Sequence, residues 1–169
     1  QVSRFCPRCG QLRWLGEPTP EQKKSTIARF APLFPHKDVG LSLDLCEMLV
    51  YLGDESVIAK AVPLVNGAPT QEEQIGYAKS LRLAKVGWTP TLREDFFKWF
   101  TRAATYTGGA SFGLFIEDIK RDSLAGLSDA EKLALKPILD AKPEAKPAAF
   151  KADAAKGGQL SAACQACHV

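Results

Sequence analysis

Two cysteines and a histidine stand close together near the end of the chain, in the segment Cys164-Gln165-Ala166-Cys167-His168. Two thiols at this spacing can add across the two vinyl groups of a haem, and the histidine that follows can bind the iron. The pattern therefore predicts one covalently attached haem c, with Cys164 and Cys167 forming the thioethers and His168 as the proximal iron ligand. The alternatives are a chance match to the pattern or an exposed redox disulfide.

The sixth iron ligand has few candidates in this chain, which contains one methionine, Met48, and one other histidine, His36. Met48 falls on the apolar stripe of an expected helix, where packing is the simpler interpretation. His36 falls in a turn between two expected helices, as an exposed or capping residue. Both remain candidates for the distal position. Otherwise the ligand lies beyond Val169 or on a partner chain, or there is none.

A second cysteine pair, Cys6-Pro7-Arg8-Cys9, is followed by Gly10 and so lacks the histidine that haem c needs. In an oxidising compartment a local Cys6–Cys9 disulfide is one interpretation. A zinc site completed by His36 and Cys46 is another, although the spacing does not match a standard zinc ribbon. Cys46 itself is expected to act as a small apolar residue on a helix.

Helices must position these residues, because start and stop signals recur along the chain and no run alternates with period two. The sequence predicts an all-α fold. The expected helices are one over 19–34 that begins at a capping box at Thr19, one from Asp38 to Gly53, one capped by Asp54, one from a capping box at Thr70 to about Lys85, one opening at Thr89-Pro90, one around 112–119, and one from a capping box at Ser128 to Leu139.

Apolar residues recur at helical spacing within these segments. The expected core stripes are Ile27, Phe30, Ala31 and Phe34; Leu41, Leu45, Met48, Leu49 and Leu52; Ile58, Ala61, Val62 and Val65; Leu92, Phe96, Trp99, Phe100 and Ala103; Phe112, Phe115, Ile116 and Ile119; and Leu133, Leu135 and Leu139. The aromatic cluster of Trp88, Phe96, Phe97, Trp99, Phe100 and Tyr106 is expected in the core, the alternative being a shield for a cofactor or partner.

Short connections predict that consecutive helices pack antiparallel, as a short solenoid or as a bundle. The segment 38–65 resembles a HEAT repeat. A stretch rich in Ala, Lys and Pro over 140–152 is expected to be a semi-rigid linker. The sequence thus divides into a CxxC segment (1–18), a HEAT-like helical domain (19–139), the linker, and a haem c attachment segment (153–169) that resembles a truncated first helix of a cytochrome c domain.

Several segments before the haem motif carry a wider resemblance. They are APTQEEQIGYA at 68–78, GWTP at 87–90, FKWF at 97–100, GGASF at 108–112 and LSDAE at 127–131. In this order they resemble a family of large bacterial proteins that join a sugar-dehydrogenase-like propeller, HEAT-like helices and a C-terminal haem c domain. The resemblance implies a helical scaffold attached to an electron-transfer haem. The propeller has no counterpart here, so dehydrogenase activity is not implied.

Charge and hydropathy indicate which partners and which location to expect. The net charge is +3, from 22 basic and 19 acidic residues, which does not favour nucleic acid as a partner. No apolar run approaches the ~20 residues of a membrane span. Because haem c is attached outside the bacterial cytoplasm, we expect a periplasmic or otherwise extracytoplasmic location.

We expect a c-type cytochrome subunit that relays single electrons to redox partner proteins, in a larger multi-subunit or multidomain assembly. The alternative is a helical scaffold or interaction subunit with no redox role of its own. The sequence shows no catalytic triad, phosphate loop or metalloprotease motif, so the chain is not expected to be an enzyme by itself, although it could belong to a larger oxidoreductase.

Overall fold

A computed structural model describes residues 17–109, 111–142 and 153–156. The described residues form helices and connecting turns without any strand, which confirms the all-α prediction. The elements are α1 (Pro20–Phe30), the 3₁₀ helix η2 (Ala31–Leu33), α2 (Val39–Leu52), α3 (Ser56–Gly67), α4 (Gln71–Leu81), α5 (Pro90–Ala103), α6 (Phe112–Ala125) and α7 (Asp129–Leu139). Asp153–Lys156 adds a single helical turn, in which the Asp153 carboxylate accepts a hydrogen bond from the Lys156 N–H at 3.0 Å.

Side-chain caps begin most of these helices where the sequence predicts them. The hydroxyl or carboxylate of the cap accepts a hydrogen bond from an otherwise unpaired backbone N–H in the first turn. The caps are Thr19 for α1, Asp38 for α2, Thr70 for α4, Thr89 for α5 and Ser128 for α7. The capping boxes at Thr19 and Ser128 are complete, whereas at Thr70 only one of the two bonds of a capping box forms, from the Glu73 N–H to the Thr70 hydroxyl. Gly53 ends α2 with a φ of 81°, a conformation that favours glycine.

Some predicted helix boundaries are wrong. The first helix ends at Phe30, and Phe34 is buried from extended backbone after η2 rather than from a helical stripe. Asp54 accepts hydrogen bonds from the N–H and hydroxyl of Ser56, but α3 begins one residue later than predicted, after Glu55. The fourth helix ends at Leu81 instead of reaching about Lys85.

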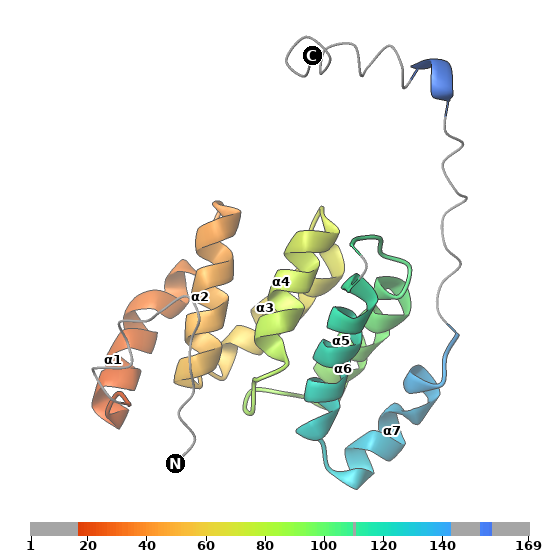
Figure 1. Ribbon diagram of the computed structural model, residues 1–169. Helices are drawn as coiled ribbons and strands as arrows, with labels where there is room; N and C mark the ends of the chain where they lie inside the picture. The colour runs from red at the N-terminus through yellow and green to blue at the C-terminus, as the bar shows by residue number, and fades with distance from the viewer. Residues whose placement is uncertain (1–16, 110, 143–152, 157–169) are drawn as a thin grey trace.

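The helices form a row. Figure 1 shows them following one another across the molecule from α1 to α7. The extensive contacts join helices one or two places apart along the chain, chiefly α3 with α4, α2 with α4 and α3 with α5, and then α5 with α7. Many of the extensive contacts thus skip one helix, as in α2 with α4, α3 with α5 and α5 with α7, and the row is held together by successive local contacts.

One continuous core runs through the row. Its fully buried side chains include Leu49 of α2, Ile58 of α3, Leu81 of α4 and Phe96 and Trp99 of α5. The stripe predicted on α3 is buried throughout. On α2, α6 and α7 the prediction is partly wrong, because Leu41 is 44% exposed, Phe115 is 38% exposed and Leu133 is 71% exposed. The buried face of α2 is instead Ser42, Leu45, Cys46 and Leu49.

The connection from α4 to α5 packs closely on the connection from α2 to α3. Gly87 has a φ of 81°, and a Cβ at this position would collide with the backbone carbonyl of Glu55. Glycine is therefore required here both by the backbone conformation and by the close approach of a second chain segment. This contact fixes where Trp88 and the start of α5 lie.

Candidate functional site

The predicted haem attachment residues Cys164, Cys167 and His168 lie outside the described residues, as do Cys6 and Cys9. Most of the predicted linker over 140–152 lies outside them as well. Of the residues predicted to bind the haem, the structure describes the two candidates for the distal iron ligand, Met48 and His36.

Met48 is half-buried on α2 and packs against the hydrophobic core. Its neighbours along the helix, Cys46 and Leu49, are fully buried. A thioether in this position contributes packing. The sulfur would have to leave that packing to bind iron.

His36 stabilises the turn before α2. Its backbone N–H donates to the Ser42 hydroxyl at 3.2 Å, and its ring Nδ1 accepts from the backbone N–H of Asp38 at 3.1 Å. Asp38 in turn caps α2 by accepting from the Leu41 N–H. Because Nδ1 accepts a hydrogen bond, the proton of the neutral ring is assigned to Nε2. An iron-bound Nε2 needs the opposite tautomer, so the geometry favours the capping role for this histidine.

Cys46 is fully buried on α2, among the core residues. Burial is the largest cause that raises the pKa of its thiol, to about 12; the charge of Glu47 adds to the shift, and a hydrogen bond with the Ser80 side chain opposes it. A zinc ligand must be a thiolate, and this environment strongly disfavours one. Within the described residues no three or more His, Cys, Asp or Glu side chains are grouped to hold a metal ion.

The aromatic cluster is core, as predicted. Phe96, Phe97, Trp99 and Phe100 are each at most 6% exposed. Their rings form a chain of tilted and edge-to-face contacts, with centroids 5.0 to 5.7 Å apart, that Trp88 and Tyr106 extend at its two ends. Such contacts stabilise the interior, and the cluster needs no cofactor to explain it.

A polar network centred on Gln74 was not predicted from the sequence. The Gln74 side-chain carbonyl accepts from Trp99 Nε1 at 3.1 Å, from Arg102 Nη2 at 3.3 Å and from the Tyr106 hydroxyl, while its amide nitrogen donates to the Ala68 carbonyl at 2.7 Å. These contacts join α4 to α5 and to the loop after α5. The carbonyl oxygen of this amide is fully engaged and its nitrogen donates one hydrogen bond, so the network serves structure.

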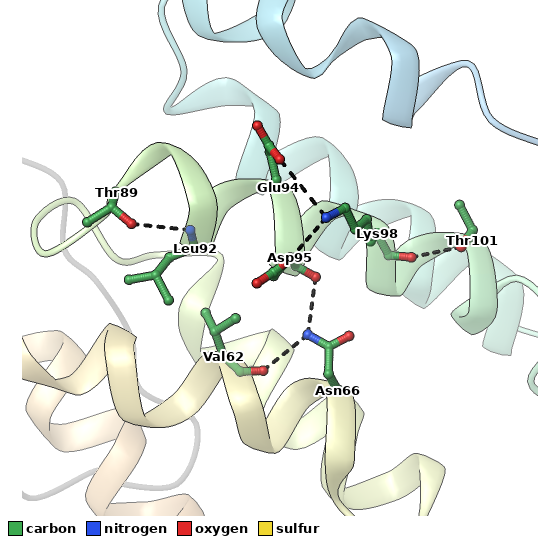
Figure 2. Close-up of polar contacts among 8 residues, drawn as sticks. All are labelled: Val62, Asn66, Thr89, Leu92, Glu94, Asp95, Lys98 and Thr101. Carbon is green, nitrogen blue, oxygen red and sulfur yellow. Dashed lines mark hydrogen bonds and ion pairs between the residues drawn. The ribbon is translucent and has the colours of Figure 1, made fainter.

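Two clefts open on the helical row. The wider one, about 410 Å³, lies between α3 and α5 and is lined by Val62, Pro63, Asn66, Leu92, Asp95 and Lys98. Figure 2 shows the Asn66 amide donating to the carbonyls of Val62 and Asp95, at 3.2 and 3.1 Å, and so joining the two helices. Lys98 pairs with Asp95 at 3.1 Å and with Glu94 at 4.0 Å. The charges lining this cleft neutralise one another, and no nucleophile and base lie together.

The second cleft, about 280 Å³, lies where the end of α4, the connection after it, α5 and α6 meet. It is lined by three basic residues, Arg82, Lys85 and Arg93, and by the aromatic residues Trp88, Phe96 and Phe97. No pattern in the sequence indicated it, because its walls come from separate helices.

None of the helices in the described ranges has both the length and the apolar content that crossing a bilayer requires. Comparison of the chain with protein-family models, curated proteins and solved structures finds no match.

Proposed function

We propose that this protein is an extracytoplasmic c-type haem protein that relays single electrons, with its helical row as a docking scaffold. The observation that carries the proposal is the Cys164-x-x-Cys167-His168 spacing. The donor set fits the group, because two thiols can form thioethers with the vinyl carbons and an adjacent imidazole can bind the iron.

The chain's own residues would have separate tasks. Cys164 and Cys167 hold the group covalently, so that it stays bound in an open compartment. His168 supplies one ring nitrogen to the metal, while its other nitrogen is expected to donate to a backbone carbonyl that orients the ring. The bound haem would supply an iron that cycles between its ferric and ferrous states.

The sixth ligand is expected to come from outside residues 17–142. Met48 packs against the core, and the Nδ1 of His36 accepts a hydrogen bond from the Asp38 N–H. Moving Met48 to an iron would break its packing against the core, and moving His36 would break the hydrogen bond that stabilises the start of α2. We therefore place the distal ligand in another part of the protein or on a redox partner.

The helical row supports the scaffold role. A row built from local contacts exposes a large surface for its size, and such arrays often bind partner proteins along that surface. The competing proposal is an interaction subunit with no redox role, and it keeps the same scaffold.

A spectroscopic experiment separates the two proposals. The chain is produced with export to a bacterial periplasm that attaches haem c, and its mass and reduced visible spectrum are measured. We expect a mass increased by one haem and the reduced α-band of c-type haem. The double variant Cys164→Ala/Cys167→Ala should lose both signals, whereas Cys46→Ala should keep both. A wild-type protein without covalent haem would overturn the electron-transfer proposal and leave the interaction subunit.

The axial ligands are tested separately. His168→Ala is expected to change the spectrum of any haem that remains attached, because the proximal nitrogen is lost. Met48→Leu and His36→Gln should leave the wild-type spectrum unchanged. A shift in either of these two spectra, in a variant whose far-ultraviolet circular dichroism is normal, would identify that residue as the distal ligand and refute its assignment to packing or capping.

A further inference from the structure

The smaller cleft carries an excess of positive charge. Arg82, Lys85 and Arg93 line it, and two carboxylates face these cations. Asp122 Oδ2 lies 3.6 Å from Arg82 Nε, and Glu131 Oε1 lies 3.0 Å from Arg93 Nε. Lys85 has no ion-pair partner among the described residues. One positive charge is therefore left uncompensated at a concave, partly apolar site.

The two arginines are not equally engaged. Arg93 forms a close ion pair and stacks its guanidinium 5.1 Å from the centre of the Trp88 ring. Arg82 is held loosely, since 3.6 Å to Asp122 is too long for a hydrogen bond. Its Nε is buried and has no hydrogen-bond partner within the described part of the chain. The Arg82 guanidinium therefore has donors free for an acceptor that enters the cleft after a small movement of this side chain.

The rest of the wall is apolar. Phe96 and Phe97 are 1% and 2% exposed. The Trp88 N–H donates to the Ala84 carbonyl at 3.0 Å, so the indole offers the cleft no free donor, and it offers only the part of its ring that Arg93 and Phe96 leave uncovered. The Ser123 hydroxyl is likewise engaged with the Ile119 carbonyl at 2.7 Å. A ligand would thus meet cations at one side and hydrocarbon at the other.

We propose that this cleft binds a small organic carboxylate. Its carboxylate pairs with Arg82 and Lys85, and its apolar body lies against the half-buried Trp88. Arginine suits a planar carboxylate because its guanidinium can donate two parallel hydrogen bonds. A volume of about 280 Å³ lies at the small end of the range for ligand sites, so the body is the size of a single ring. The site is independent of the haem proposal.

Benzoate is the probe, and benzamide is its neutral control of equal shape. The full-length protein is titrated in low-chloride buffer by isothermal titration calorimetry, and tryptophan fluorescence is recorded in parallel because Trp88 lines the cleft. We expect saturable binding of benzoate and none of benzamide. Arg82→Gln should weaken benzoate binding at least tenfold. Lys79→Gln, which removes an exposed charge from the same α4 helix, should leave it unchanged.

Lys85→Gln provides a second test if Arg82→Gln fails to fold, as judged by circular dichroism, and it should weaken binding severalfold. The Cys164→Ala/Cys167→Ala protein, which cannot hold haem covalently, should bind benzoate as the wild type does. A loss of binding in that double variant, non-saturable benzoate titration, equal binding of benzamide, or wild-type affinity in the folded arginine and lysine variants would each overturn the proposal.

Discussion

The surroundings of each sulfur decide the chemistry of the cysteines in this chain. In the proposed haem attachment Cys164 and Cys167 would react as thiols, whereas Cys46 lies fully buried on α2 with a pKa raised to about 12. At neutral pH the Cys46 thiol is therefore protonated and shielded. It contributes packing to the core, and this environment disfavours the thiolate that a metal ligand requires.

Alkylation tests this assignment. In the folded protein at mildly alkaline pH, Cys46 should remain unmodified by iodoacetamide, because the reagent attacks an accessible thiolate and this thiol is neither accessible nor ionised. In denaturant it should react fully. Peptide mass spectrometry measures the modified fraction at Cys46 alone. Rapid modification of the native protein would contradict the buried assignment.

The same thiol makes stability depend on pH. Between its ordinary pKa of 9.0 and its folded value of about 12, the unfolded chain loses the Cys46 proton while the folded chain keeps it. The free energy of unfolding should therefore fall as pH rises through this range, by at most ~1.4 kcal/mol per pH unit from this group. Urea unfolding of wild type and Cys46→Ala at several pH values isolates this slope, which the variant should lack.

Gln74 shows how one amide can stabilise several elements. Gln74→Met keeps the size of the side chain but leaves Trp99 Nε1, the Tyr106 hydroxyl and Arg102 Nη2 without this acceptor. We expect the free energy of unfolding to fall by about 2 kcal/mol, since partly buried donors lose their partner. Lys79→Met, on an exposed position of the same helix, should change it little. Equal midpoints in urea would show that the network does not stabilise the fold.

At the scale of elements, helix starts follow from single side chains. Thr89 begins α5 by accepting from the Leu92 N–H at 3.2 Å, as Figure 2 shows. Thr89→Ala should lower the free energy of unfolding by about 1 kcal/mol, the usual value of a lost cap. Thr91→Ala, in the first turn of the same helix and exposed, is the matched control and should be nearly neutral. Thermal or urea unfolding of both variants measures the difference, and a Thr91 effect as large as that of Thr89 would argue against capping.

Caps were predictable from the sequence because their hydrogen bonds join residues three positions apart. Burial was harder to predict from the sequence, because helical periodicity identifies an apolar stripe but not the element that packs against it. Leu41 and Leu133 fit their stripes and are nevertheless exposed, at 44% and 71%. Leu133 belongs to α7, the last helix of the row, and no described helix follows to cover it. The Gln74 network and the basic cleft were missed because their members are brought together only by packing between separate helices.

At the scale of the whole molecule, the contacts between helices are local. The contacts that join α2 to α4, α3 to α5 and α5 to α7 pass along the row, and Figure 1 shows α1 and α7 at its opposite ends. The sequence left a solenoid and a bundle as alternatives. The observed contacts favour the solenoid-like arrangement, in which each helix depends mainly on its neighbours.

This arrangement predicts that a destabilising substitution at one end of the row lowers the stability of nearby helices and leaves distant helices unchanged. Leu135 is the buried leucine of α7, at 3% exposure, and Leu135→Ala removes about 2–5 kcal/mol of packing. Amide hydrogen exchange should rise in α7 and in α5, the helix that α7 packs against, while α2 keeps the protection of the wild type, because no extensive contact joins α2 to either of these helices. Leu133→Ala, at an exposed position of the same helix, should alter exchange in neither region. A uniform rise across all the helices after Leu135→Ala would instead show that the row unfolds as one cooperative unit, as a bundle does, and would remove the physical basis for treating the helical region as an extended docking surface.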